Sequence, residues 1–327
     1  MLSIQDIVKR YESHTALDKV SMEIPDRCIF GLLGPNGAGK TSLIRIINQI
    51  TAPDSGSITM NGQPLHRTHI SRIGYLPEER GLYKKMEVGE QVIYLARLKG
   101  LSRSDATARA RSWFLKFDLY NWWNKKVEDL SKGMQQKVQF ISTVIHEPDL
   151  LILDEPFSGF DPINAELVKD EIINFYKQGK SVIFSTHRLE RIEEFVTHIA
   201  LLNNAHKILD GTTRELINQH RSNTYQVDYK TPGLATPKDS ADDKNAVGRV
   251  DFNAIAATGA VEFVSQFSTE DGQAAIFRIP SGNVNILLSA LIPHMQIQGI
   301  RELVPTISDI FIRQVKQAET EPTTIQV

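Results

Sequence analysis

The sequence predicts an α/β fold built on a parallel, doubly wound sheet, followed by a smaller α+β domain. Between residues 150 and 202, short apolar runs alternate with helical patterns, which is typical of helices that connect parallel strands. Earlier, a glycine-rich turn lies between an apolar run at residues 28–33 and a helical pattern. The length of 327 residues is enough for two domains of ordinary size.

The elements predicted before residue 87 are mostly short strands, because β-branched and apolar residues occur there in short runs between turn residues. They are strands at residues 3–11, 17–24 and 28–33, a helix at 39–50, and a short strand between turns at 53–56 and 61–62. The helix is predicted from apolar residues that recur every three or four positions.

Residues 87–147 are predicted to be mostly helical, with Gly100 and Pro148 as breaks. Strands and helices then alternate: a strand at 150–153, a helix at 165–177, a strand at 181–185, a helix at 188–196 and a strand at 199–202. We therefore assign residues 1–220 to one domain.

A second domain is predicted at residues 221–315, after a change in composition near residue 230. Residues 231–248 are rich in proline, glycine and small polar residues, which favours a flexible surface loop. The predicted order is strand 224–229, helix 253–257, strands 261–267 and 274–279, helix 284–292, strand 295–303 and helix 308–315. The first six of these follow the βαββαβ order of a ferredoxin-like domain. Residues 316–327 are expected to be a polar tail.

A glycine-rich loop is the strongest local signal. Residues 34–41 read GPNGAGKT and fit the pattern G-x-x-x-x-G-K-[ST]. In this pattern backbone N–H groups point at phosphate oxygens, the lysine reaches the β- and γ-phosphates, and the Ser/Thr hydroxyl ligates Mg²⁺. The predicted nucleotide-binding residues are Gly34, Pro35, Asn36, Gly37, Ala38, Gly39, Lys40, Thr41 and Ser42, with Thr41 also a metal ligand.

Two acidic residues follow a buried strand and complete this site. Four apolar residues at 150–153 end in Asp154 and Glu155. A carboxylate from an adjacent strand is needed to hold Mg²⁺, which we assign to Asp154. Glu155 lies one residue further toward the γ-phosphate, where it can polarise a water for in-line attack. We therefore predict Glu155 and Lys40 as catalytic residues.

Further motifs give the chain a specific resemblance. Residues 130–137, LSKGMQQK, resemble the L-S-G-G-Q signature of ABC ATPases and stand upstream of Asp154 at the start of an amphipathic helix. Residues 158–161 resemble the D-loop of that family, and residues 185–187 its switch histidine. Tyr11 resembles the aromatic residue that stacks on adenine. The resemblance is strong over residues 1–220 and weaker beyond them.

Membership in this family implies a composite ATP site. In ABC ATPases the signature helix of one subunit closes on the γ-phosphate held by the other subunit, so Ser131 and Gly133 would bind the nucleotide in trans. Asp161, in the stretch that resembles the D-loop, is also expected at the nucleotide. The resemblance also implies His187 as a catalytic residue. It further implies a parallel sheet core with an antiparallel β subdomain and a helical subdomain, ATP and Mg²⁺ as ligands, and a homodimer or heterodimer of ATPase subunits.

The chain departs from the common ABC ATPase pattern in the signature and in the Q-loop, and these departures indicate one branch of the family. The signature holds Lys132 and Met134 where Gly and Gln are usual, and Glu78 occupies the glutamine position of the Q-loop. Glu78 is expected at the nucleotide and the metal. These variants resemble ABC ATPases of sodium and drug exporters, in which the ATPase pairs with a separate integral-membrane permease. The resemblance thus implies the energising subunit of an exporter.

Composition limits the alternatives. The 37 basic and 39 acidic residues give a net charge of −2, which does not favour a nucleic-acid partner. No apolar run approaches the ~18 residues needed to span a bilayer, so we expect a cytoplasmic protein, peripheral on the cytoplasmic face of the membrane. The alternative is a soluble ABC ATPase acting on ribosomes or nucleic acid, although one phosphate loop and no sustained heptads argue against its usual forms.

Overall fold

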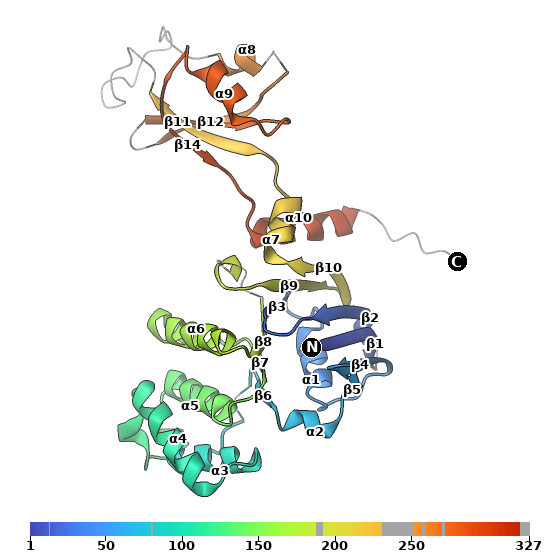
Figure 1. The fold of residues 1–327 in the computed structure, drawn as a ribbon, viewed down its shortest axis with the longest axis vertical. Coiled ribbons are helices and arrows are strands. Elements are labelled where there is room, and N and C mark those ends of the chain that lie inside the picture. The colour runs from blue at the N-terminus through green and yellow to red at the C-terminus, as the bar shows by residue number, and fades with distance from the viewer. Residues whose placement is uncertain are drawn as a thin grey trace. The chain divides into compact units, whose positions relative to one another are not determined.

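The computed structural model describes residues 1–12, 14–79, 81–187, 192–230, 251–256, 259–269 and 272–320. The chain divides into two compact units (Figure 1). The first unit contains Met1–Arg214 together with Phe311–Val327, and the second contains Glu215–Ile310. The first unit has two sheets and the second has one, and each unit has its own apolar core.

A six-stranded sheet forms the centre of the first unit, with the order β10-β9-β3-β8-β7-β6. Its strands are β3 (Ile29–Leu33), β6 (Ile73–Leu76), β7 (Leu150–Asp154), β8 (Ser181–Thr186), β9 (His198–Asn203) and β10 (His206–Thr212). All neighbours pair in parallel except β10, which runs antiparallel to β9. The carboxyl ends of β3, β7 and β8 therefore meet at one edge of the sheet.

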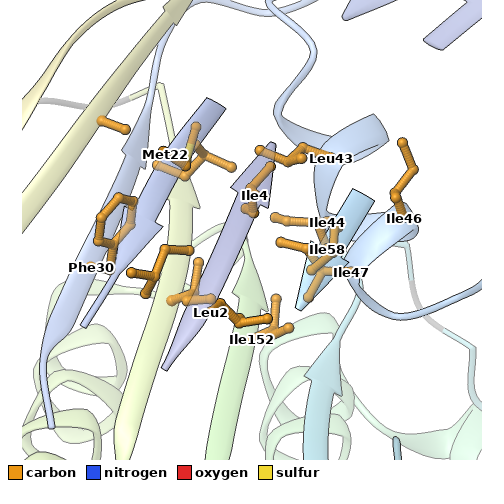
Figure 2. Packing of buried hydrophobic residues seen from close by; sticks show 14 of the residues in the cluster. Leu2, Ile4, Met22, Phe30, Leu43, Ile44, Ile46, Ile47, Ile58 and Ile152 are labelled. Atoms are coloured by element: carbon orange, nitrogen blue, oxygen red, sulfur yellow. The ribbon is translucent and has the colours of Figure 1, made fainter. Parts of the chain in front are cut away.

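A second, antiparallel sheet has the order β2-β1-β4-β5. It consists of β1 (Leu2–Tyr11), β2 (His14–Ile24), β4 (Ser55–Met60) and β5 (Gln63–Pro64). Helix α1 (Lys40–Ile47) shares one apolar core with both sheets, as Figure 2 shows. Ile4 of β1, Ile44 of α1 and Ile152 of β7 all belong to this core. The helix that follows the glycine-rich loop is thus fixed from two sides.

Helices flank the central sheet and form a separate helical region at residues 88–144 (Figure 1). The α-helices of this unit are α1, α2 (Arg67–Ile70), α3 (Val88–Leu98), α4 (Arg103–Lys116), α5 (Lys132–Val144), α6 (Pro162–Lys177), the start of α7 (Thr213–Gln219) and residues 311–320 of α10 (Ile307–Thr320). Short 3₁₀ turns lie at Tyr120–Trp122, Val127–Asp129 and Ile192–Glu194. Aromatic packing holds the helical region together: Phe114 meets Trp123 at 5.0 Å between ring centroids, and Phe117 meets Phe140 at 5.7 Å.

The second unit is a four-stranded antiparallel sheet with the order β12-β13-β11-β14. Its elements are β11 (Thr224–Lys230), α8 (Phe252–Ala256), β12 (Glu262–Thr269), β13 (Gly272–Arg278), α9 (Val284–Leu291) and β14 (Gln296–Glu302). The βαββαβ order and this strand arrangement agree with the predicted ferredoxin-like domain. Its core is aromatic and aliphatic, with Phe252 stacked on Phe263 at 5.1 Å and Leu287 fully buried.

The structure differs from two of the predicted segments, and a third segment lies outside the described residues. The helix predicted at 188–196 is wrong over its described part, since only a 3₁₀ turn forms at Ile192–Glu194 and residues 188–191 lie outside the described residues. The loop predicted at 231–248 also lies outside them. The polar tail predicted from residue 316 is wrong up to residue 320, because α10 (Ile307–Thr320) continues that far. Among the described residues, no helix is long and apolar enough to cross a membrane.

Candidate nucleotide-binding site

The loop between β3 and α1 depends on glycine for its shape. Gly39 caps α1 with φ +104°, and a Cβ there would lie 2.2 Å from the carbonyl oxygen of Ala16. At Gly34, with φ +146°, a Cβ would lie 2.1 Å from the carbonyl oxygen of Leu202. At both positions a side chain is disfavoured by the positive φ and would also clash with a backbone carbonyl oxygen. The loop is therefore held close against β2 and β9 and delivers the first N–H groups of α1 to its open side.

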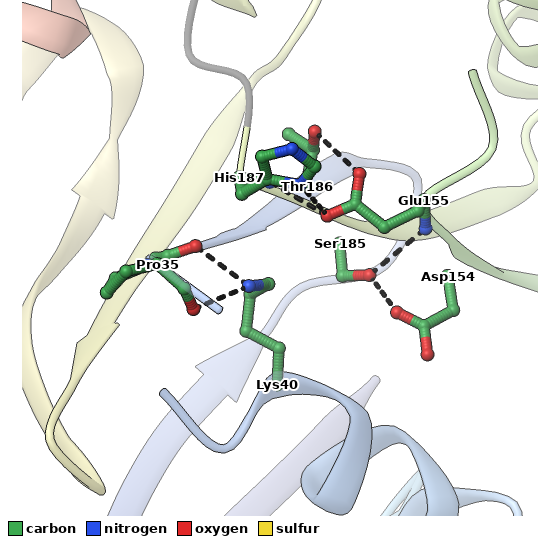
Figure 3. A network of polar contacts seen from close by, with 8 residues as sticks. Pro35, Lys40, Asp154, Glu155, Ser185, Thr186 and His187 are labelled. Atoms are coloured by element: carbon green, nitrogen blue, oxygen red, sulfur yellow. Dashed lines mark hydrogen bonds and ion pairs between the residues drawn. The ribbon is translucent and has the colours of Figure 1, made fainter. Parts of the chain in front are cut away.

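Lys40 is folded back over this loop (Figure 3). Its side chain is buried, with 6% of the residue exposed, and its ammonium donates to the carbonyl oxygens of Gly34 at 2.8 Å and Pro35 at 3.0 Å. Burial lowers the pKa of Lys40, while the carboxylates of Glu155, Asp154 and Glu78 oppose that shift. The ammonium has three N–H groups, of which two bond to the loop, so the third can donate to a ligand.

Asp154 lies at the end of β7 and is 1% exposed. One carboxylate oxygen, Oδ1, accepts a hydrogen bond from the hydroxyl of Ser185 on β8, the residue opposite it in the parallel register (Figure 3). The other oxygen, Oδ2, is buried and has no hydrogen-bond partner among the described residues. An ionised carboxylate oxygen without a donor is costly to bury. A hard cation such as Mg²⁺, which prefers oxygen ligands, fits this vacant acceptor.

Glu155 is held by the residues that end β8. It has φ +50°, and its carboxylate accepts from the hydroxyl of Thr186 at 3.2 Å and from the backbone N–H of His187 at 2.9 Å. The Nδ1 atom of His187 lies 2.7 Å from Glu155 Oε1 (Figure 3). A left-handed conformation in a non-glycine residue is strained and is found where the surroundings fix it. The strand ends therefore determine where the Glu155 carboxylate points.

The other predicted residues occupy element ends in the first unit. Tyr11, at the end of β1, is 41% exposed, and the Lys9 ammonium lies 5.3 Å from its ring centroid. Ser131 caps α5 and accepts from the N–H of Met134 at 3.3 Å. Among the described residues, neither Tyr11 nor Ser131 makes a hydrogen bond to the group around Lys40.

Gly133 lies in the first turn of α5 and Asp161 at the start of α6. A Cβ on Gly133 would lie 3.9 Å from the carbonyl oxygen of Gly159, so the loop before α6 passes close to the start of α5. Asp161 caps α6 and accepts from the N–H of Asn164 at 3.0 Å. The structure thus brings together Lys40, Asp154, Glu155 and His187, and leaves the signature residues at a separate helix start.

Sequence reasoning missed the polar partners of the acidic pair. Ser185 and Thr186 precede His187 in the sequence, and their hydroxyls donate to the carboxylates of Asp154 and Glu155. Strand register is the signal that could have found them, because parallel pairing places Asp154 opposite Ser185. Glu78 is exposed, and its charge reaches Lys40.

A phosphate loop, a buried acidic pair and a histidine meet at the carboxyl edge of a parallel sheet, and this combination defines a P-loop nucleotide hydrolase. The sequence profile of the family described as ABC transporter matches residues 17–158. The chain is 46% identical over 216 residues to the ABC transporter ATP-binding protein YhaQ of Bacillus subtilis. The aligned region covers 66% of this chain and 72% of that protein. The chain belongs to the family of ABC transporter ATP-binding proteins.

Two further comparisons agree with this assignment. The Nod factor export ATP-binding protein I of Burkholderia thailandensis is 33% identical over 220 residues, covering 66% of this chain and 72% of that protein. A solved structure of an ATP-binding subunit of an ABC transporter superposes with a TM-score of 0.63 at 28% identity, covering 67% of this chain and 92% of that one. The chain is an ATP-binding subunit with ATPase activity coupled to transport, and such subunits act as pairs with a membrane permease.

Proposed function

We propose that this chain energises an exporter by hydrolysing ATP between two head-to-tail copies of its first unit, with residues 1–220 as the ATPase domain and 221–315 as an accessory domain. The observation that carries the proposal is the convergence of Lys40, Asp154, Glu155 and His187 at one sheet edge. Backbone N–H groups of residues 34–42 bind the phosphates, Lys40 contacts the β- and γ-phosphates, and Tyr11 stacks on the adenine.

Glu155 is the proposed general base. Its Oε1 accepts from His187, so the histidine orients the carboxylate toward the water that attacks the γ-phosphate. Thr41 and Asp154 would hold Mg²⁺, which when bound neutralises charge that develops on the phosphates. The vacant Oδ2 of Asp154 supports this assignment. Glu78 is proposed to approach the same region, consistent with its electrostatic influence on Lys40.

The second half of each site is proposed to come from the partner copy. Ser131 caps α5 and Gly133 lies in its first turn, and a helix start is a favourable anion site. Asp161 caps α6, and Gly159, two residues before it, lies near Gly133. ATP would be bound between the phosphate loop of one copy and the α5 start of the other, so that binding closes the pair and hydrolysis releases it. The pair is either a homodimer or a heterodimer.

The permease is proposed to dock in a groove of about 530 Å³ between β6 and the helical region. Both apolar and polar residues line it, among them Tyr75, Leu82, Leu95, Gln139 and His146. A cytoplasmic segment of the permease would fill this groove, which places the chain on the cytoplasmic face of the membrane. Export of a sodium or drug-like substrate is proposed from the sequence variants at Glu78 and Lys132 and from the similarity to an export ATP-binding protein. The relatives are transporter subunits and do not favour the alternative of a ribosome- or nucleic-acid-directed ATPase.

Two substitutions test the composite site. Lys40→Ala removes the ammonium from the cis half, so equilibrium binding of ATP to the monomer should be lost. Ser131→Arg fills the trans half, so monomer binding should persist while turnover is abolished. Ser102→Arg is the matched control, because Ser102 also caps an exposed helix start, that of α4, outside the site. If Ser131→Arg weakens monomer binding as much as Lys40→Ala, the composite site is wrong.

A further inference from the structure

The segment at residues 77–83 connects β6 to α3 and carries Glu78; Arg80 within it lies outside the described residues. Two buried glutamines of the helical region hold this segment, one from α5 and one from α3. Gln139 is 5% exposed and Gln91 is 0% exposed. Neither residue belongs to the phosphate loop, the acidic pair or the signature.

Gln139 bonds to the backbone on both sides of Glu78. Its Nε2 atom donates to the carbonyl oxygen of Pro77 at 3.0 Å and to that of Glu79 at 3.3 Å. One side-chain amide therefore bonds to the carbonyl group of the residue before Glu78 and to that of the residue after it. At the other end of the segment, Gln91 Oε1 accepts from the N–H of Tyr83 at 2.9 Å. The segment leaves the central sheet and is secured to the helical region at three backbone groups.

The same helix joins Gln139 to the proposed trans site. Helix α5 begins after its cap, Ser131, and Gln139 lies eight residues later, or about 12 Å along the axis at ~1.5 Å per residue. An α-helix of this length moves as a rigid rod, so a displacement at its start reaches Gln139. Gln139 also lines the groove beside β6, and its Oε1 atom is buried without a partner among the described residues.

We propose that Gln139 is a positioning residue that transmits movement of α5 to Glu78. The inference rests on the proposed function, because it takes the start of α5 as the part that responds to ATP. When the Ser131 end of α5 closes on the γ-phosphate, Gln139 draws the Glu78 segment with it and sets the distance of the Glu78 carboxylate from the phosphate loop. The Oε1 atom of Gln139 would accept a hydrogen bond from the molecule that fills the groove. A molecule bound in the groove would therefore also fix the position of Gln139 and of the Glu78 segment.

Hydrogen–deuterium exchange of the full chain carrying Glu155→Gln tests this linkage. With ATP and Mg²⁺ added, exchange in α5 and in residues 77–83 should slow together. Gln139→Met in the same background keeps the length of the side chain and removes both amide groups. We expect α5 to respond to ATP as before, while the ATP-dependent change at residues 77–83 falls at least about fivefold, since two buried donations are lost.

Lys99→Met is the matched control. The Lys99 ammonium donates to the carbonyl oxygens of Ile70 at 3.0 Å and Ile73 at 2.8 Å, and it lines the same groove without touching the Glu78 segment. This variant should leave the ATP response of residues 77–83 intact. A response lost equally in Lys99→Met would mean general loosening of the groove and would overturn the proposal, as would a full response in Gln139→Met.

A kinetic readout separates positioning from packing. With Glu155 intact, Gln139→Met should lower kcat for ATP about five- to tenfold and change KM less than twofold, because the phosphate loop is untouched. A parallel loss of ATP affinity would overturn the positioning role. If α5 of the parent chain shows no response to ATP at all, the proposed head-to-tail site fails, and this outcome is distinct from failure of the Gln139 linkage.

Discussion

The two units differ in whether all of their buried polar atoms are hydrogen-bonded. In the second unit, Gln226 is the buried polar residue among the described ones, and both ends of its amide are bonded: Nε2 donates to Asp228 at 2.7 Å and Oε1 accepts from Arg301 at 2.8 Å. In the first unit, buried polar atoms of Asp154, Gln139 and Gln91 have no partner among the described residues. Hydrogen-bonded polar groups stabilise a fold. A buried polar atom without a hydrogen-bond partner costs free energy and is typical of a site that binds a ligand or a partner protein.

Sheet topology explains why Asp154 and the other residues of the nucleotide site gather in the first unit. Parallel strands bring their carboxyl ends to one edge, so the residues after β3, β7 and β8 meet there. In the antiparallel sheet of the second unit, successive strands end at opposite edges, and its connections are spread over both. The polar residues of the nucleotide site therefore lie together in the first unit, whereas the second unit is held by its aromatic and aliphatic core.

The largest expected effect is loss of the general base. Glu155→Gln should lower ATP turnover about 10²–10⁴-fold, because the amide keeps the shape of the side chain and cannot take a proton. ATP binding should persist, and the variant should accumulate as an ATP-dependent dimer in gel filtration. Glu171→Gln, which changes a buried glutamate away from the site, is the control and should not slow turnover by more than a small factor. A monomeric Glu155→Gln chain with full turnover would reject the role.

Core truncation in the second unit should separate stability from nucleotide binding. Phe277 is fully buried and its ring centroid lies 5.5 Å from that of Phe252. Phe277→Ala should cost about 3–5 kcal/mol in the unfolding of that unit. ATP affinity should stay within about twofold of the parent. Phe30→Ala, in the core beneath the phosphate loop, should lower both stability and ATP affinity. Equal loss of ATP affinity in the two variants would remove the distinction between the units.

A buried histidine should make the first unit sensitive to acid. Burial, assisted by the charge of Lys99, lowers the pKa of His146 from 6.5 to about 4. Between these two pH values, His146 is protonated in the unfolded chain and neutral in the folded chain. The free energy of unfolding therefore falls by roughly 2–3 kcal/mol as the pH drops from about 6.5 to about 4. His146→Gln should flatten this part of the pH profile in urea unfolding. Parallel profiles for the two chains would contradict the prediction.

The smallest effect is expected at Glu78. Its carboxylate adds a negative charge near the γ-phosphate, and Glu78→Gln removes that charge while keeping the side-chain length. Turnover of the isolated subunit, without permease, should rise a few-fold, with ATP affinity little changed. Steady-state ATPase assays provide the measurement. Unchanged turnover with and without permease would take Glu78 out of the mechanism.

Much of the first unit follows from the sequence, because each of its motifs has a local physical cause. Glycines, Lys40 and the acidic pair lie within short patterns, and the strands before them are continuous apolar runs. The contacts of Gln139 and Ser185 could not be found this way, since they join residues 60 and 31 positions apart. These bonds depend on strand register and helix packing, which periodicity does not encode.

The failed expectations have similar causes. Residues 192–196 have helical composition, yet Ile192 and Val196 pack into the core as a short turn before β9. Residues 316–320 are polar, but they extend a helix whose buried face begins at Ile307 and Ile310. Tertiary packing decided the conformation in the first case, and continuation of an existing helix decided it in the second.

Mixing two inactive chains tests the central claim most directly. Lys40→Ala and Ser131→Arg should each be inactive alone, because every site in either dimer has one damaged half. A mixed dimer contains one site with Lys40 from one chain and Ser131 from the other, and both of these are intact. The mixture should regain ATP turnover, up to about a quarter of the parent if dimers form at random and sites act independently. A mixture no more active than its components would contradict an ATP site shared between two copies.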